Sequence, residues 1–337
     1  MQGRLENQVK IERQIENLLK EMPKVVSEYY MNFSINREFR SCLVYIQKIK
    51  MFLTFYAEEN DVDIMDINFD GITDLDISRF LKSIETKTNA KGDVKYTSFS
   101  YRKMTWSVLN SFFAFLYKKG YTKSNPLDLI ERPTKNDKVD HVFLQKEDLN
   151  KIIEAIKRGA GTEKAINCQN KWKERDMAIF FTFICTGMRE SALCEIDMNK
   201  IDFKNNILEV VDKEHKQNTY TISPLLKKKL VKWMNKREIL LGNEECDALF
   251  ISNRKSRINA HSVIHLINKY SQEGLGYKVS PHRLRAAFCN LMYEETHDIE
   301  FTSQTMKHKN VSTTRIYIET NEKKVNDKSA KIIDSLF

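Results

Sequence analysis

Residues 280–289 of the chain read SPHRLRAAFC, and residues 306–317 read MKHKNVSTTRIY. Pro281 opens a helix in which His282 and Arg285, three residues apart, share one face. Upstream, residues 186–189 read TGMR, which ends an apolar run and begins a helix-like segment. These three stretches contain arginine, histidine and tyrosine side chains in a fixed order, and they decide how the second half of the chain is interpreted.

Each of these residues, taken singly, has an ordinary structural explanation. Arg189 alone is typical of a surface or ion-paired arginine, His282 of a helix cap and His308 of a solvated loop histidine. Tyr317 lies in an alternating apolar stretch and would pack with its hydroxyl satisfied. The order and the spacing carry the argument instead: His308 follows His282 by 26 positions, and Tyr317 follows His308 by 9.

In this order and at this spacing the stretches resemble the tyrosine recombinase family, which includes phage integrases and the Xer recombinases. That family has a Thr-Gly-Leu-Arg run, a His-x-x-Arg box, and a Leu-Gly-His run followed by Thr-Thr and Tyr. The corresponding residues here are Thr186–Arg189, His282 and Arg285, Met306–His308, Thr313–Thr314, and Tyr317. The resemblance extends over most of the chain, because the polar break after Asn125–Pro126 is similar to the family's domain junction.

Three positions depart from the family's pattern. Ala192 stands where an acidic residue is common, Ala286 where histidine is common, and Lys307 in place of the glycine of Leu-Gly-His. None of the three removes a reacting group, so the resemblance implies an active but divergent enzyme.

The resemblance implies DNA strand cleavage in which Tyr317 attacks a phosphodiester, leaving a 3′-phosphotyrosine and a free 5′-hydroxyl. Arg189 and Arg285 would hold the non-bridging oxygens, because guanidinium groups stay charged and bind phosphate bidentately. His308 would donate a further hydrogen bond, and His282 would accept the proton of Tyr317 or orient it. The covalent ester preserves the bond energy, so neither a metal nor any other cofactor is expected.

In this family a lysine on a β-hairpin protonates the leaving oxygen. Lys213 is expected to match it, because it lies in the polar stretch between two β-rich runs, Ile207–Val211 and Thr219–Ile222. Lys216 is the alternative, since the loop lacks the glycine-flanked pattern of the family.

The composition suits a polyanionic partner. The 337 residues carry a net charge of +9, with a pI near 9.0, and 41% of them are hydrophobic. Lysines and arginines that neutralise phosphates release counterions, so nucleic acid is a natural partner, although charge alone fits any basic soluble protein. Five prolines and ten glycines argue against long disordered tracts and favour a largely helical protein.

Cysteine usage and hydropathy indicate a cytoplasmic protein. The six cysteines are scattered without a CxxC pair, which predicts structural thiols rather than disulfides or zinc ligands. The sequence has no N-terminal signal pattern and no apolar stretch of membrane-spanning length.

Apolar periodicity predicts helices throughout both halves of the chain. In the first half they are expected at about residues 5–20, 36–59 and 99–119, with a shorter helix capped by Asp74. In the second half they are expected at residues 144–156, 225–241, 261–270 and 282–294. The proline-bounded polar segment from Asn125 to Asp140 is the best domain boundary.

Together with the resemblance, this pattern predicts a mainly α fold with a small β-sheet, arranged as a two-domain, C-shaped DNA clamp. We expect an N-terminal accessory helix (1–25), a helical, SAM-like core-binding domain (26–132), a linker (133–140) and an α+β catalytic domain (141–325). Residues 326–337 form a tail helix that is exchanged between subunits in this reading. Its expected anchors are Ile332, Ile333, Leu336 and Phe337.

The implied partners are double-stranded DNA recombination sites and further copies of the chain, two per site and four in a synapse. An accessory excisionase-type protein is a further candidate partner, and no membrane is involved. Candidate phosphate contacts are the basic residues near the helical regions: Arg102, Lys103, Lys118 and Lys119 in the first half, and Arg254, Lys255 and Arg257 in the second.

The expected function is therefore site-specific recombination through a phosphotyrosine and a Holliday junction, integrating or excising a transposon or phage. Two alternatives stay open. A type IB topoisomerase or a telomere resolvase would use the same covalent chemistry, and a non-catalytic DNA-binding regulator would use none. The intact Arg, Lys, His, Arg, His and Tyr set argues against the regulator.

Overall fold

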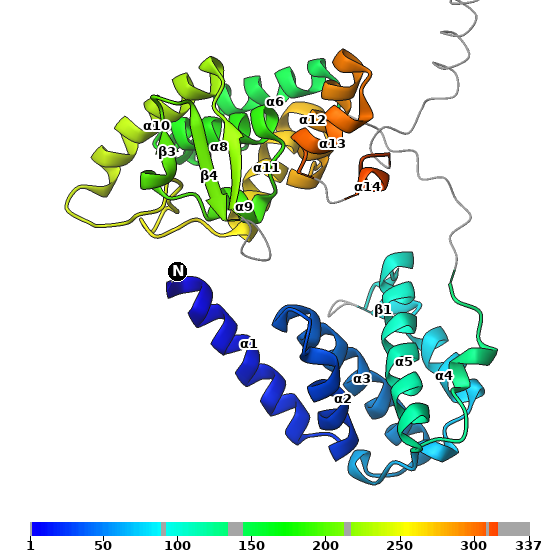
Figure 1. Ribbon diagram of the computed structural model, residues 1–337. Helices are drawn as coiled ribbons and strands as arrows, with labels where there is room; N and C mark the ends of the chain where they lie inside the picture. Colours follow the sequence, from blue (N-terminus) through cyan, green and yellow to red (C-terminus); the bar gives the residue numbers. More distant parts are fainter. Residues whose placement is uncertain (1, 89–91, 134–143, 212–216, 308–309, 316–337) are drawn as a thin grey trace, which may run out of the picture. The chain divides into compact units, whose positions relative to one another are not determined.

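The computed structural model describes residues 2–88, 92–133, 144–211, 217–307 and 310–315 (Figure 1). The chain divides into two compact units, Met1–Lys138 and Val139–Phe337, and each is considered by itself. Within the described ranges, no helix is long and apolar enough to cross a membrane.

The first unit is a helical bundle with one small hairpin. Its elements are α1 (Gln2–Lys20), α2 (Lys24–Ser34), α3 (Phe39–Asn60), α4 (Asp74–Ser83), β1 (Thr86–Thr88), β2 (Val94–Tyr96) and α5 (Phe99–Lys119), with short 3-10 turns at Ile64–Asp66, Phe69–Gly71 and Pro126–Leu129. The aromatic stripe of α5 packs in the core: Phe112 and Phe113 are fully buried, and Phe113 stacks edge-on against Phe52 of α3.

Local signals account for the ends of these helices. The predicted helix at 99–119 is confirmed to the residue, because the Ser98 hydroxyl accepts the Tyr101 amide and Gly120 ends the helix at a φ of +76°. The cap expected of Asp74 was wrong by one position. Thr73 is the N-cap, and its capping box with Asp76 satisfies two backbone amides.

The second unit is mainly helical, with a small sheet at one side (Figure 1). Its helices are α6 (Lys146–Arg158), α7 (Glu163–Asn170), α8 (Lys173–Thr186), α9 (Glu190–Cys194), α10 (Pro224–Leu241), α11 (Ala260–Leu275), α12 (Pro281–Thr296), α13 (Ile299–Thr305) and α14 (Val311–Arg315), with a 3-10 turn at Met198–Lys200. Helix α8 is central, because ten of its residues are buried, and it packs against α6, α10 and α12.

The sheet is antiparallel, with the order β3 (Ile201–Asp202), β4 (Ile207–Val211) and β5 (Gln217–Thr221). The hairpin predicted from the β-rich runs is confirmed. Strand β4 has the expected limits, while β5 begins two residues earlier than expected and pairs Gln217 with Val211. Strand β3 and the β1–β2 hairpin carry no clear β pattern and escaped the sequence analysis.

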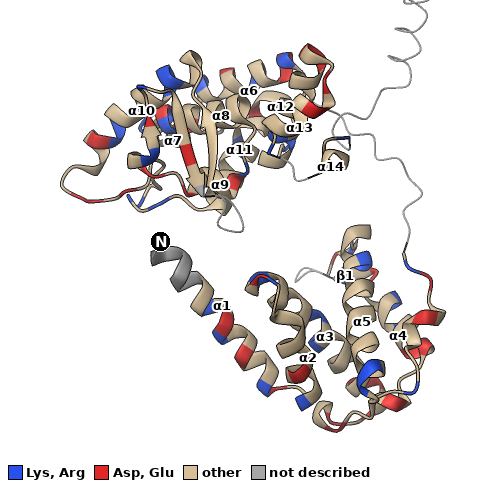
Figure 2. Ribbon diagram, viewed as in Figure 1, with Lys and Arg blue, Asp and Glu red and all other residues tan. Residues whose placement is uncertain are grey.

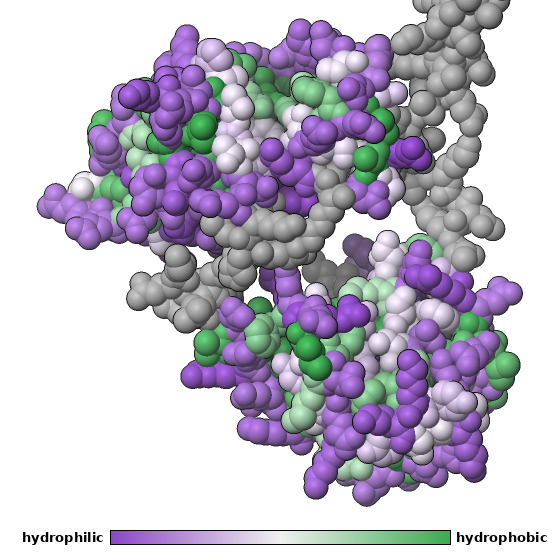
Figure 3. All heavy atoms as spheres, viewed as in Figure 1, coloured by the Kyte–Doolittle hydropathy of each residue, from purple (hydrophilic) through white to green (hydrophobic). Residues whose placement is uncertain are grey.

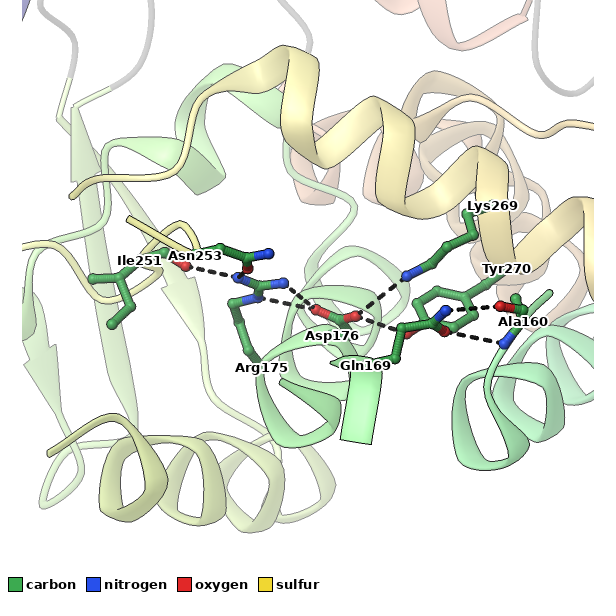
Figure 4. A network of polar contacts seen from close by, with 8 residues as sticks. All are labelled: Ala160, Gln169, Arg175, Asp176, Ile251, Asn253, Lys269 and Tyr270. Carbon is green, nitrogen blue, oxygen red and sulfur yellow. Dashed lines mark hydrogen bonds and ion pairs between the residues drawn. The ribbon is translucent and has the colours of Figure 1, made fainter. Parts of the chain in front are cut away.

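A buried polar network ties α8 to α11 and to the loop that precedes α11 (Figure 4). The Asp176 carboxylate, 1% exposed, accepts hydrogen bonds from Arg175 Nη2 at 2.8 Å and from the Tyr270 hydroxyl at 2.7 Å. Lys269 Nζ lies 3.9 Å from the same carboxylate. Arg175 continues the network to the loop, donating to Asn253 Oδ1 at 2.9 Å.

Apolar side chains are mostly inside each unit, and the visible face of each is largely hydrophilic (Figure 3). The cysteines fit the expectation of structural thiols in part: Cys42, Cys194 and Cys289 are buried, whereas Cys168 is exposed, and all are free. Burial raises the pKa of Cys289 to about 11, although the charge of Arg285 opposes this effect. The raised pKa keeps the thiol protonated.

Candidate active site

The TGMR stretch forms the turn between α8 and α9. Thr186, the last residue of α8, is buried, and its hydroxyl donates to the Thr182 carbonyl at 2.6 Å. The same oxygen accepts the amide of Met188 at 3.3 Å, which holds the chain as it leaves the helix. Met188 is fully buried, and Arg189 follows as the N-cap residue of α9, with its side chain partly exposed.

Gly187 is required in this turn for two independent reasons. Its φ of +60° lies in the left-handed region that glycine adopts without strain. A Cβ at this position would also lie 2.3 Å from Cδ1 of Phe288, whose ring, from α12, closes over the turn. The glycine therefore sets how closely α12 approaches the end of α8.

Arg285 joins all three sequence stretches. It is only 2% exposed, and its guanidinium donates from Nη1 to the carbonyl of Gly187 and from Nη2 to the carbonyl of Met306, the latter at 2.6 Å. The His-x-x-Arg box thereby contacts the backbone of both the TGMR turn and the segment that leads to His308. Stretches about 100 residues apart along the chain are brought to one guanidinium.

His282 lies close enough to Arg285 and Arg189 for both charges to affect its pKa. His282 sits in the first turn of α12, where Ser280 caps the helix and Pro281 occupies its first position. Partial burial of the imidazole, with the charges of Arg285 and Arg189, lowers the pKa of His282, and Glu190 opposes them. The residue as a whole is exposed, so the neutral ring is accessible to a proton donor from solvent or substrate.

Lys307 occupies the position where the family has glycine, and its backbone explains that preference. Its φ is +55°, in the left-handed region, and its amide bonds to the Gln304 carbonyl at 3.0 Å to close the end of α13. Helix α14 then begins after Asn310, whose side chain accepts the Ser312 amide at 3.0 Å.

Several predicted site residues lie outside the described residues. They are Lys213 and its alternative Lys216, His308, Tyr317, and the tail anchors Ile332, Ile333, Leu336 and Phe337. The described strands β4 and β5 flank the segment that contains both lysines, and α14 ends two residues before Tyr317. Arg189, His282 and Arg285 are thus the described members of the set, and the structure brings them together.

The basic residues of α5 fall at its two ends, where Figure 2 shows blue ribbon. Lys103, near the start, is separated from Lys118 by 15 residues, roughly 22 Å along a helix that rises 1.5 Å per residue. Lys118 and Lys119 are exposed, whereas Arg102 pairs with Glu85 at 3.1 Å. The two ends cannot serve the same phosphate.

The basic residues at 254–257 differ in what they contact. Arg257 pairs with Asp197 and donates to the Cys194 carbonyl at 2.9 Å, so it joins the loop to the end of α9. Lys255 contacts Glu244 at 2.7 Å. Arg254 is exposed at the tip of the turn, on the loop that the Arg175 network anchors. Arg254 is therefore the best placed of the three for a phosphate contact.

Sequence reasoning missed the residues that position these groups. The Thr186 hydroxyl and the Phe288 ring fix the turn before Arg189, and two main-chain carbonyls fix Arg285. The carbonyls carry no side-chain signal, so no sequence pattern could have pointed to them. Among the described residues, no group of three or more His, Cys, Asp or Glu side chains could hold a metal ion.

Comparison with known proteins shows which family the chain belongs to. Residues 141–324 match the model of the phage integrase family. The chain belongs to this family. Among characterised relatives, the tyrosine recombinase XerC of Thermodesulfovibrio yellowstonii is 30% identical over 216 residues, which span 63% of this chain and 68% of that protein. The chain is accordingly a tyrosine-type site-specific DNA recombinase.

Solved structures give the same fold over nearly the whole recombinase. A lambda integrase (75–356) dimer bound to a COC′ core site superposes with a TM-score of 0.63 at 18% identity, covering 88% of this chain and 95% of that one. The Tn1549 transposon integrase (82–397) in complex with circular intermediate DNA gives 0.64 at 16% identity, covering 91% and 99%. The predicted mainly α fold with a small sheet, built as a helical part followed by an α+β part, is confirmed.

Proposed function

We propose that this recombinase breaks and rejoins DNA through a covalent bond between Tyr317 and a 3′-phosphate. The observation that carries the proposal is the position of Arg285, whose guanidinium contacts the backbone of the other two stretches. The charges of Arg285 and Arg189 both act on His282, which supports a positive centre of the kind that phosphoryl transfer requires.

In the proposed cleavage step, the Tyr317 hydroxyl oxygen attacks phosphorus, and the bond from phosphorus to the 5′-oxygen breaks. Arg189 and Arg285 neutralise the non-bridging oxygens, and His308 donates to one of them. His282 accepts the phenol proton, which its lowered pKa allows because the imidazole is neutral near pH 7. Lys213, or Lys216 in its place, protonates the departing 5′-hydroxyl, and the reverse sequence rejoins the strands.

The proposed biological setting is the exchange of strands between two duplex sites through a Holliday junction, serving integration or excision of a mobile element. Two copies would bind each site and four would form the synapse, with residues 326–337 docking on a neighbouring copy. The two units would act as core-binding and catalytic domains of a C-shaped clamp around DNA. The DNA-bound lambda and Tn1549 integrases support the use of this fold on such substrates.

The test is covalent capture from a pool of randomised duplexes, each with a nick placed to trap the cleaved strand. After denaturation, DNA that remains attached to the protein is recovered and sequenced. We expect adducts on a limited set of sequences with wild-type protein, none with Tyr317→Phe, and an undiminished yield with the matched control Tyr293→Phe. Adducts that persist in Tyr317→Phe, or no adduct with wild type, would falsify the assignment.

The same material separates this function from its alternatives. Relaxation of supercoiled plasmid without any selected site would indicate a type IB topoisomerase, and hairpin ends would indicate a telomere resolvase. Sequence-specific binding without any covalent product would indicate a DNA-binding regulator.

A further inference from the structure

Lys48 is a buried cation without a matching anion. It lies on α3 and is 7% exposed, and its Nζ has no hydrogen-bond partner within the part of the chain that the structure describes. The ammonium sits 3.0 Å from the ring centroid of Tyr101, so the face of that ring is its contact. Burial lowers the pKa of Lys48, the interaction with Tyr101 opposes that effect, and the nearby charge of Lys87 adds to it. A buried ammonium whose contact is a neutral ring rather than a carboxylate keeps much of its desolvation cost.

The neighbouring hairpin adds two more positive charges. In the β1–β2 register Lys87 lies directly opposite Lys95, and both are exposed. Like charges directly opposite each other destabilise a strand pair. Lys87 Nζ also lies 4.5 Å from the Tyr101 ring centroid, so the ring contacts two ammonium groups at once. The fold therefore concentrates positive charge where folding alone would disperse it.

The N-terminal end of α5 adds to the positive electrostatic potential near these lysines. This 21-residue helix has no acidic residue in its first turn, and its N-terminal dipole favours an anion. Thr97 anchors the hairpin to the helix start through its hydroxyl, which donates to the Ile84 carbonyl at 2.8 Å. The nearby carboxylates are Glu85, which pairs with Arg102, and Asp93 at the base of β2. Figure 1 shows β1 beside this end of α5.

We infer that Lys48 and Lys87, which contact the ring of Tyr101, and Lys95, which lies opposite Lys87 in the hairpin, form a binding site for the phosphates of a DNA duplex, which we call the hairpin lysine site. The inference rests on the proposed function for its ligand, and it adds an interaction surface that the basic residues of α5 alone did not indicate. A phosphodiester entering the site relieves the repulsion between Lys87 and Lys95 and gives Lys48 a counter-charge.

The first test measures how the binding of duplex DNA depends on salt. A fluorescein-labelled duplex of unrelated sequence is titrated with the full chain by anisotropy over a series of KCl concentrations. Each lost phosphate contact reduces the slope of log K against log salt by about 0.9, so Lys87→Gln/Lys95→Gln should reduce it by about 1.8. The control Lys10→Gln/Lys20→Gln removes two exposed charges from α1, which also carries Glu12 and Glu16, and should leave the slope unchanged.

The second test uses Lys48→Met, which replaces the buried ammonium with an apolar side chain of similar length. We expect this variant to melt a few degrees higher without DNA, since a core-facing charge has been removed, and to bind the duplex with a smaller salt slope. Opposite changes in stability and binding distinguish a ligand site from a structural lysine. A lower melting temperature with unchanged DNA binding would overturn the role of Lys48.

Lysine acetylation footprinting provides a readout that needs no variant. Bound duplex should protect Lys87 and Lys95 from acetylation and leave Lys10 and Lys20 reactive. If the double variant keeps the full slope and footprint while wild type still forms its covalent adduct, the hairpin lysine site is refuted and the proposed function stands. If wild type shows neither salt-dependent binding nor an adduct, the proposed function itself fails.

Discussion

At the scale of single residues, the turn before Arg189 depends on a glycine that the sequence presents only as part of a motif. Gly187→Ala adds the left-handed strain of a non-glycine residue, about 1–2 kcal/mol, and a clash with Phe288 worth about 1–3 kcal/mol. We expect a loss of about 2–5 kcal/mol in the free energy of unfolding, measured by urea denaturation.

Gly276 offers the matched control for this substitution. Its φ is +80°, but a Cβ there would meet nothing within 4 Å. Gly276→Ala should therefore cost only the backbone strain, about 1–2 kcal/mol. Equal losses in the two variants would show that the contact with Phe288 does not constrain the turn.

The charge state of His282 gives a prediction about pH. Burial and the two nearby arginines lower its pKa from the ordinary value of 6.5, so the free enzyme loses its neutral imidazole only below that pH. The kcat/KM for cleavage reports the free enzyme and should fall as pH decreases through this lowered pKa. The measurement is the cleavage rate at subsaturating DNA across a pH series, once a target duplex is in hand.

His297→Gln, at the other end of α12, is the control and should keep the acid limb unchanged. His282→Gln should cleave slowly at every pH and should not show the fall of kcat/KM at acid pH. A midpoint above 6.5 in wild type, or a limb retained in His282→Gln, would exclude His282 as the proton acceptor.

At the scale of elements, the Asp176 network fixes the loop that carries Arg254 (Figure 4). Asp176→Asn leaves the buried Arg175 and the partly buried Lys269 without their carboxylate and should destabilise the second unit by about 3–5 kcal/mol. Tyr270→Phe removes one hydrogen bond to the same carboxylate and should cost about 1 kcal/mol. Urea denaturation of both variants compares their losses in the free energy of unfolding. A smaller loss for Asp176→Asn than for Tyr270→Phe would contradict the network's role.

The elements also show how far the sequence could be interpreted. Helix α5 and strand β4 have their predicted limits, because a cap or a β-rich run marks each of them. Helix α2 and strands β1 and β2 were not predicted. The strands are three residues each: TKT is wholly polar, and VKY, although apolar residues flank its lysine, is too short to show a periodic pattern. Tertiary contacts, which no short window contains, hold such elements in place.

The candidate site likewise contains features that the sequence predicted and features that it could not predict. The order and spacing of the motifs predicted that Arg189, His282 and Arg285 act together, and the structure brings them to one centre. What the sequence could not provide is the means of support, since Arg285 bonds to main-chain carbonyls. Lys48 also escaped notice, because a lysine within an apolar helix pattern is ordinarily assigned to solvent.

At the scale of the whole molecule, the two units have separate hydrophobic cores. One draws on residues from Ile15 to Leu127 and the other on residues from Leu144 to Ala287. Each is large enough to fold without the other, so residues 1–138 and 139–337 should each unfold cooperatively as isolated fragments.

The intact chain permits a stricter check of this independence. Trp106 reports on the first unit, while Trp172 and Trp233 report on the second. In single-tryptophan variants, Gly187→Ala should shift the transition seen by Trp233 and leave that of Trp106 in place. A common shift of both transitions would show that the units unfold as one.

The hydrogen bonds that hold Arg285 have a consequence for DNA selection under the proposed mechanism. A free arginine side chain carries about 2 kcal/mol of rotamer entropy, which a ligand must overcome when it immobilises the side chain. Here the two carbonyls restrict the guanidinium during folding, before any DNA arrives. The binding energy that a correct duplex supplies is then free to bend and align the DNA. Under the proposed mechanism, a misplaced phosphate would therefore meet a rigid receptor rather than an accommodating one.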